Sequence, residues 1–347
     1  MRKTIGYIVM STFLFSSMEI VLKLAGGTFS ALQLNFLRFL IGGLVLLPLA
    51  MKFLRQHQLR ILPHWGIFAL TGFVCVIVSM TFFQLAVENA PAATVAVLFS
   101  CNPVFALLFS YILLHETLSR TSIISVVISV IGLLIIINPA HLTNPFGLSL
   151  AVISAITFGL YSIISRWGSQ KYHYNGIVMT TFTFLFGAAE LLIGIGLSHL
   201  PVVTRALANP GLKDFVNIPV VQGISWSSLP MLAYIGIGVT GLGFAFYFIA
   251  MERSDVSTAS LVFFIKPGLA PIMAAIILGE RIPGLTIVGI VIILLGSVIS
   301  FVGESFIERV DKMLPWHKKI QSTICKINSV PAVPAAWLVV LELFVFM

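Results

Sequence analysis

The fold is decided by two stretches of the chain: ATVAVLFSCNPVFALLFSYILLHETLS at residues 93–119 and TASLVFFIKPGLAPIMAAIILGERI at residues 258–282. Each stretch is strongly apolar, carries a proline near its middle and has a glutamate just after its apolar part. A helix needs about 20 apolar residues to cross the hydrocarbon core of a bilayer. Each stretch is therefore predicted to be a membrane-spanning helix followed by a polar connection.

The two stretches belong to a longer internal repeat. A shift of 164 residues, the separation of Asn102 from Lys266, aligns 88–139 with 252–303 without a gap. Apolar identities are common among membrane helices, so the proline and the glutamates at fixed spacing carry the most weight. The identical pairs are Gly72/Gly236, Phe82/Phe246, Ala86/Ala250, Glu88/Glu252, Thr94/Thr258, Phe99/Phe263, Pro103/Pro267, Ala106/Ala270, Ile112/Ile276, Leu114/Leu278, Glu116/Glu280 and Gly132/Gly296.

The composition of the whole chain fits a bilayer. Of 347 residues, 59% are hydrophobic and 9% are charged, and the mean hydropathy is +1.07. Soluble domains average about 25% charged residues. So few charges cannot cover a water-facing surface, which argues against a soluble enzyme, a nucleic-acid-binding protein and a disordered chain.

Ten segments are long and apolar enough to span a membrane. They predict an all-α integral membrane protein with ten transmembrane helices. The segments are 5–24, 31–53, 65–87, 91–114, 120–138, 146–166, 175–199, 228–251, 256–278 and 284–303. The connection 200–227 is rich in Pro, Asn and Gly, and we expect a solvent loop there, with room for a surface helix.

The repeat divides the chain into two five-helix units, 1–140 and 141–303, followed by a cytoplasmic tail, 304–347, of unknown role. Because each unit holds an odd number of spans, the second unit enters the membrane upside down. Inverted repeats are typical of secondary transporters, which bind their substrate near the midplane between the halves.

The distribution of basic residues predicts that both termini are cytoplasmic, since cytoplasmic loops carry an excess of Lys and Arg. With that orientation, nine basic residues lie inside and four lie outside before the tail is counted. The inner group is Arg2, Lys3, Lys52, Arg55, Arg60, Arg120, Arg166, Lys171 and Arg253, and the outer group is Lys23, Arg205, Lys213 and Arg281. We expect a multi-pass protein of the cytoplasmic membrane, in contact with membrane lipids.

Both quoted stretches, each followed by a helix with Gly132 or Gly296, resemble the EamA-type half of the drug/metabolite transporter superfamily. Arg38-Phe39 early in the second span is also similar to that family. The resemblance covers about residues 5–303. It implies a ten-helix carrier for small metabolites whose fourth and ninth helices line a central cavity. The long tail and the charge at Lys266 depart from the usual pattern.

Four charged residues lie well inside the predicted spans, away from the span ends: Glu19, Arg38, Glu190 and Lys266. A charge at a helix centre costs about 2.5–3.5 kcal/mol, so it normally faces a cavity or a partner. Lys266 lies about 15 Å along its helix, near the midplane. Its repeat mate is Asn102, and each directly precedes a proline, Pro103 or Pro267, that tends to kink a helix. This pair is the best candidate for a substrate site.

Glu19 and Arg38 lie toward the same side of adjacent antiparallel helices and are candidates for a salt bridge or a gate. Alternatively, Glu19 meets Lys266 across the cavity and binds a coupling proton. Gln84, Tyr161 and Tyr247 are further candidates for substrate hydrogen bonds, and Glu116 and Glu280 are expected to satisfy amides at helix ends. We expect Glu190 to be paired or to reach toward the interface.

The sequence offers no catalytic or cofactor motif. Gly236–Gly241 reads as GxGxxG but lies inside an apolar span with no preceding strand. There is no HExxH, no P-loop and no spaced cysteine pair, so no metal or cofactor is expected. The leading hypothesis is a secondary transporter of a small polar metabolite, an amino acid or carboxylate, by alternating access. A channel and a membrane enzyme acting on lipid-linked substrates are the alternatives. The oligomeric state does not follow from the sequence.

Overall fold

The computed structural model describes residues 2–115, 120–137, 144–207, 214–253 and 256–313. Within these ranges every regular element is a helix and none is a strand. This is the outcome that a bilayer imposes, because a helix satisfies its own backbone hydrogen bonds where no water is available. The predicted all-α membrane class is confirmed.

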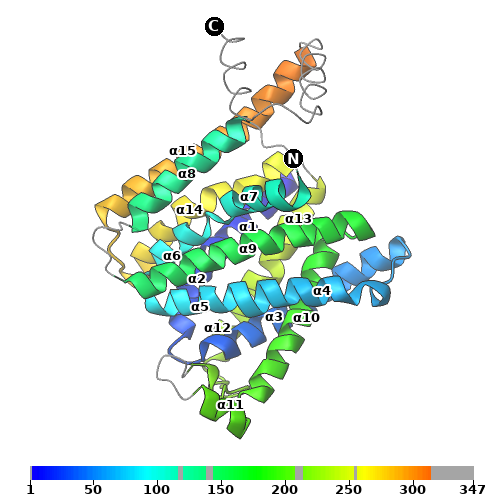
Figure 1. Cartoon of the computed structure of the whole chain (residues 1–347), viewed down its shortest axis with the longest axis vertical. Coiled ribbons are helices and arrows are strands. Elements are labelled where there is room, and N and C mark those ends of the chain that lie inside the picture. The colour runs from blue at the N-terminus through cyan, green and yellow to red at the C-terminus, as the bar shows by residue number, and fades with distance from the viewer. Residues whose placement is uncertain (1, 116–119, 138–143, 208–213, 254–255, 314–347) are drawn as a thin grey trace, which may run out of the picture.

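The helices follow one another along the chain, and most of the connections between them are short (Figure 1). In order they are α1 (Arg2–Ser16), α2 (Met18–Ala25), α3 (Ala31–Gln56), η1 (Leu62–His64), α4 (Trp65–Gly72), η2 (Phe73–Ser79), α5 (Met80–Asn89), α6 (Ala92–Phe99), α7 (Asn102–Leu114), α8 (Arg120–Ile137), α9 (Pro145–Tyr172), α10 (Gly176–Leu197), α11 (Pro201–Ala206), α12 (Leu229–Ala233), η4 (Tyr234–Leu242), α13 (Gly243–Arg253), α14 (Val256–Leu278) and α15 (Gly284–Met313).

Seven helical segments of the described chain are long and apolar enough to cross a membrane. They are Thr4–Ala25, Ala31–Gln56, Leu62–Asn89, Ala92–Leu114, Pro145–Tyr172, Gly176–Leu197 and Leu229–Met251. Three shorter apolar helices, Ile123–Ile137, Ile265–Leu278 and Gly284–Gly296, fall within the other predicted spans. A multi-pass protein is thus established, whereas the count of ten spans stays a prediction.

Two of the predicted spans contain a π-helical segment, η2 in 65–87 and η4 in 228–251. The shift of 164 residues carries Phe73–Ser79 of η2 onto positions 237–243, so the two segments overlap in the repeat. Such π-helical turns are rare and occur often at functional sites. Their recurrence at related positions marks these two spans as counterparts.

The first predicted span, 5–24, is divided at Ser17 into α1 and α2 rather than forming one helix. The Ser17 hydroxyl donates to the Leu14 carbonyl at 2.9 Å and lies 2.8 Å from the Tyr234 hydroxyl of η4. A side-chain hydroxyl that bonds its own backbone competes with the helix, which explains the break.

Helices of the two predicted halves interleave. α1 packs against α13 and α14, and its counterpart in the predicted repeat, α9, packs against α5 and α7. Likewise, α3 packs against η4, and its counterpart α10 packs against η2 and α4. Three further contacts, α3 with α10, α6 with α14 and α8 with α15, each join a helix to its counterpart. The set of contacts is unchanged when the halves are exchanged.

α8 and α15 lie side by side along one edge of the bundle (Figure 1). Their close approach depends on glycine, since a Cβ at Gly132 would lie 2.9 Å from the Gly289 carbonyl oxygen. α15 continues to Met313, ten residues past the predicted end of the last span at 303. The rest of the predicted tail lies outside the described residues.

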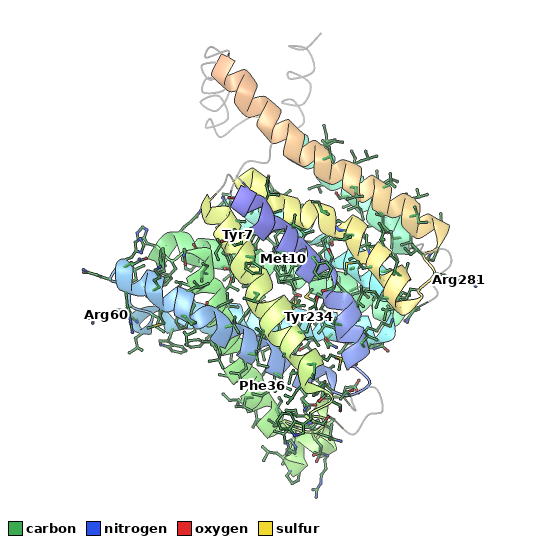
Figure 2. All side chains as sticks on the ribbon, turned by 180° about the vertical axis from the view of Figure 1, so that it is seen from behind. Tyr7, Met10, Phe36, Arg60, Tyr234 and Arg281 are labelled. Carbon is green, nitrogen blue, oxygen red and sulfur yellow. The ribbon has the colours of Figure 1, made fainter. Side chains whose placement is uncertain are left out.

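The long connection between α10 and α12 contains a short surface helix, α11, as expected. It is held against the bundle by Gln33, whose amide donates to the carbonyls of Val220 and Gln222 at 3.0 and 2.7 Å. Arg60 and Arg281, from two other connections, lie at opposite ends of the bundle (Figure 2).

Candidate functional site

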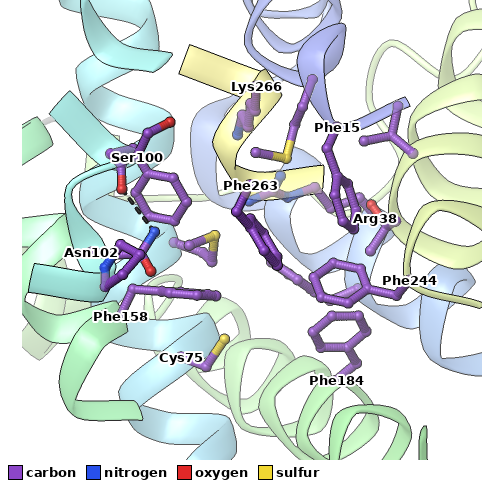
Figure 3. A pocket seen from close by; sticks show the side chains of 17 residues that line it. Phe15, Arg38, Cys75, Ser100, Asn102, Phe158, Phe184, Phe244, Phe263 and Lys266 are labelled. Atoms are coloured by element: carbon purple, nitrogen blue, oxygen red, sulfur yellow. Dashed lines mark hydrogen bonds between the residues drawn. The ribbon is translucent and has the colours of Figure 1, made fainter. Parts of the chain in front are cut away.

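The bundle contains a central cavity of about 60 Å³ (Figure 3). Its lining comes from eight of the ten predicted spans, while α8 and α15 contribute none of the described lining residues. The polar lining residues are Arg38, Cys75, Ser100, Asn102, Thr240 and Lys266. Seven phenyl rings form most of the rest, those of Phe15, Phe39, Phe99, Phe158, Phe184, Phe244 and Phe263.

Lining residues occur in pairs related by the shift of 164 residues. Four such pairs face the cavity: Cys75/Val239, Met80/Phe244, Phe99/Phe263 and Asn102/Lys266. Positions that correspond in the predicted repeat thus line the same space. This is the arrangement expected of a site that lies between two related halves.

Lys266 of α14 forms a buried ion pair with Glu19 of α2. Its Nζ lies 2.8 Å from Glu19 Oε1, and the two side chains are 6% and 1% exposed. The pair is at contact distance but does not have the angles of a hydrogen bond, and Glu19 Oε2 has no hydrogen-bond partner among the described residues. The Lys266 ammonium also lies 5.4 Å from the centre of the Phe99 ring. Of the two pairings considered for Glu19, the structure has the one across to Lys266.

Arg38 of α3 pairs with a neutral neighbour instead of Glu19. Its Nε donates to Asn35 Oδ1 at 2.9 Å, and its guanidinium carbon lies 4.5 Å from the centre of the Phe39 ring. The side chain is 1% exposed, and its Nη2 has no hydrogen-bond partner in the described part of the chain. The expected Glu19–Arg38 salt bridge is therefore not formed.

The two prolines that were expected to kink equivalent helices have unequal surroundings. Before Pro103 the helix is interrupted, with α6 ending at Phe99 and α7 starting at Asn102. The Asn102 side-chain amide donates to the Phe99 carbonyl at 2.8 Å and so satisfies a group that the interruption exposes. Pro267 lies inside the single helix α14, so the helix is interrupted in the first stretch only, and the kink expected at Pro267 stays a prediction.

The other predicted site residues, Gln84, Tyr161 and Tyr247, are not among the lining residues. Gln84 is fully buried and donates to Glu88 Oε1 at 3.2 Å. Tyr161 packs edge-on against Phe158, and Tyr247 packs edge-on against Phe263, both of which do line the cavity. The two tyrosines thus lie directly behind lining residues, and the role of all three polar residues in binding stays a prediction.

The phenylalanines are the site residues that the sequence analysis missed. Phe99 and Phe263 were noted as identities in the repeat but not as a binding surface. The available signal was their position: each lies three residues before the Asn102/Lys266 pair, so each returns to the same side of its helix. Cys75 and Thr240 gave no such signal, because the π-helical turns that carry them change the face on which a residue lies.

A second polar cluster closes one end of the bundle. The Glu280 carboxylate accepts hydrogen bonds from the amides of Ala92 and Ala93, at the first turn of α6, at 2.9 and 3.0 Å. Lys23 of α2 lies 3.3 Å from Glu280 Oε1 and donates to the Ala90 carbonyl at 2.6 Å. The expected capping role of Glu280 is confirmed, whereas Glu116 lies outside the described residues.

Glu190 of α10 is the last of the four charged residues that lie well inside the predicted spans. It is half-buried and does not line the cavity, and its Oε2 has no hydrogen-bond partner within the described ranges. The expected pairing of this carboxylate is not seen there.

Comparisons with known proteins agree with this architecture. The sequence pattern of the EamA-like transporter family matches residues 2–138 and 145–302. An uncharacterized transporter of Clostridium kluyveri is 34% identical over 311 residues, which cover 87% of this chain and 94% of that protein. A probable terminal-alkyne amino-acid exporter of Streptantibioticus cattleyicolor is 22% identical over 236 residues, covering 68% and 71%. A solved crystal structure that is 20% identical superposes with a TM-score of 0.58 over 86% of this chain and 97% of its own, and shows the same fold.

Proposed function

The chain belongs to the EamA-like transporter family, and from this premise we propose that it carries a small anion-bearing metabolite across the cytoplasmic membrane by alternating access. The single observation that supports the proposal most strongly is the central cavity, which is lined from both predicted halves and includes Lys266, the cation of the buried Glu19–Lys266 pair. A buried ion pair contributes little to stability on its own, because desolvation of two charges offsets their attraction. Its presence at the centre of a membrane bundle favours a functional role.

Alternating access is supported by the exchange symmetry of the helix contacts and of the lining positions. In a pair of inverted repeats, one half rocks against the other around a fixed site. We therefore propose that 1–140 and 141–303 act as the two inverted five-helix units, which gives ten spans.

The cluster around Glu280 is proposed to be the closed end of the pathway. It joins α2 and α6 of the first unit to the connection after α14 of the second, so a rocking motion would separate its partners. With both termini in the cytoplasm, as the basic residues predict, this is the outer end. The state described here then has its outer side closed.

The residues that line the cavity support a proposal for the substrate class. Two cations and seven phenyl rings suit a molecule with a carboxylate and an apolar body, and an amino acid belongs to that class. The name of the S. cattleyicolor relative, an amino-acid exporter, points to the same chemistry.

We also propose that Glu19 binds a coupling proton. A desolvated carboxylate favours its neutral form and a nearby cation favours its charged form, so a partner that moves away changes its proton affinity. The groups that face Glu19 are Lys266 on α14 and Arg38 on α3, and Tyr234 of η4 reaches the neighbouring Ser17.

Flux into proteoliposomes tests the proposed function. Purified protein should give transport of labelled carboxylates that saturates with concentration and is competed by unlabelled substrate, as binding in a discrete cavity requires. Flux that rises linearly with concentration would indicate a channel instead, and the absence of flux for every carboxylate and amino acid tested would overturn the proposal.

Proton coupling has its own test in the same vesicles. Flux by the unmodified protein should vary between pH 5 and pH 8, and Glu19→Gln should make it independent of pH. An unchanged pH profile in Glu19→Gln would remove Glu19 from the coupling step and leave the transport proposal intact.

A further inference from the structure

We propose that Arg38, rather than Lys266, binds the anionic group of the substrate, and that the substrate is a monoanionic carboxylate with an apolar body. The inference rests on the proposed transport function and makes its site specific. The sequence favours Lys266 as the residue that binds the anionic group, because it lies near the midplane. Its position alone does not show whether its charge is free to bind a substrate.

Lys266 is already neutralised. Its ammonium lies 2.8 Å from the Glu19 carboxylate, and both side chains are almost completely buried. An incoming carboxylate would have to displace Glu19 from its cation or lie beside a like charge. Arg38 then supplies the remaining positive charge among the described lining residues, so the cavity carries one uncompensated positive charge in this state.

Arg38 has donors that lack acceptors. Its Nε is used by Asn35, but its Nη2 has no partner, and neither has Asn35 Nδ2. Both residues are 0–1% exposed and lie one helical turn apart on α3, and Arg38 faces the cavity. Buried donors are nearly always hydrogen-bonded in folded proteins, so two neighbouring donors without acceptors indicate a place for a missing acceptor.

The guanidinium group selects the kind of acceptor. Its planar fork matches the two oxygens of a carboxylate, whereas an ammonium acts as a point charge. One uncompensated charge matches a monoanion better than a phosphate monoester, which carries close to two negative charges at neutral pH.

The side chains around Arg38 indicate the chemical character of the rest of the substrate. The ring of Phe39 lies under the guanidinium, Phe184 packs tilted against Phe39, and Phe244 packs edge-on against Phe184. Figure 3 shows Phe263, Phe244 and Phe184 gathered around the space next to Arg38. A carboxylate at Arg38 would therefore place its apolar part among aromatic rings.

The experiment compares a carboxylate with its uncharged amide. Thermal unfolding of the purified protein in detergent is followed at pH 7.5 with increasing 3-phenylpropanoate or 3-phenylpropanamide, and apparent dissociation constants are taken from the shifts. The unmodified protein should bind the acid at least about tenfold more tightly than the amide, as expected for a charge-assisted hydrogen bond.

Arg38→Lys keeps the charge and removes the fork. It should weaken binding of the acid by about tenfold and leave binding of the amide unchanged, so that the preference disappears. Arg55→Lys, at an exposed arginine of the same helix, is the matched control and should keep the preference. An unchanged preference in Arg38→Lys, or binding of neither probe by the unmodified protein, would overturn the assignment.

A second variant decides the matter if Arg38→Lys does not fold. Glu19→Gln with Lys266→Met removes the ion pair and leaves Arg38 as the charged group of the described lining. Retention of the acid preference would support Arg38, and its loss would assign the anion to Lys266. These results are distinct from failure of the proposed function, which is read from the absence of saturable flux in vesicles of the unmodified protein.

Discussion

Residues 92–114 and 256–278 are two copies of one sequence element, yet the first is divided into α6 and α7 while the second is the continuous helix α14. The residue before each proline explains the difference. Asn102 has a short amide that returns to the Phe99 carbonyl, which stabilises the interruption. The ammonium group of Lys266 does not return to its own backbone but extends to the Glu19 carboxylate.

The comparison shows that two stretches of similar sequence can carry residues with different chemical properties at the same position. The position before the proline carries a neutral, hydrogen-bonded side chain in Asn102 and a buried charge in Lys266. A substrate bound in the cavity would therefore contact different side chains on its two sides. The shared Phe99 and Phe263 both line the cavity, and we propose that the residues that differ between the two stretches determine what it binds.

The largest effect is expected from removing the charge in the second copy. Lys266→Met leaves Glu19 as a buried carboxylate without its partner, which should lower the free energy of unfolding by about 3–5 kcal/mol. Thermal unfolding in detergent checks the loss, and Lys52→Met, at an exposed lysine, is the control. A melting temperature equal to that of the control would contradict the claim that the pair is desolvated.

Removing both charges should separate stability from transport. In Glu19→Gln with Lys266→Met neither charge is left uncompensated, so most of the lost stability should return, while flux should stay about 100-fold below that of the unmodified protein. Melting temperature and vesicle flux are measured on the same preparation. Recovery of both together would mean that the ion pair is structural.

A smaller effect is expected in the first copy. Asn102→Ala removes the hydrogen bond to the Phe99 carbonyl and should cost about 1 kcal/mol, with a drop in flux of less than about tenfold. The comparison predicts that this loss is smaller than that of Lys266→Met, and the reverse order would show that the interruption matters more than the charge.

The smallest effect is expected at the end of the bundle. Glu280→Gln keeps the shape of the group but removes its charge opposite Lys23 and the first turn of α6, which should cost about 0.5–1 kcal/mol. By weakening the closed end it should change flux by a few-fold. Vesicle flux measures the effect, and a flux equal to that of the unmodified protein in both Glu280→Gln and Lys23→Met would argue against a moving contact.

Much of the architecture could be predicted from the sequence, because long apolar segments in a bilayer have few alternatives to helices. The repeat also predicted that Asn102 and Lys266 lie at one site, because corresponding positions of two inverted repeats face the same central space. The pairing of Glu19 was left open for a physical reason: two cations lie within reach of it, and only packing decides which is nearer.

Most of the apolar part of the site could not be predicted from the sequence, although the positions of Phe99 and Phe263 three residues before Asn102 and Lys266 offered a signal for those two. Twenty-eight phenylalanines are spread through the chain, and nothing in the composition distinguishes the seven that face the cavity from those that face lipid. A kink is expected at both prolines, and the complete interruption before Pro103 depends on the side chain of Asn102, which the proline alone does not predict. The kink expected at Pro267 stays a prediction.

The central claim is that the Glu19–Lys266 pair lies in the transport pathway, and counterflow in proteoliposomes tests it most directly. Vesicles with the unmodified protein should exchange an internal carboxylate for a labelled external one, and vesicles with the folded Glu19→Gln and Lys266→Met protein should show almost none. Counterflow within about twofold of the unmodified protein would contradict the account.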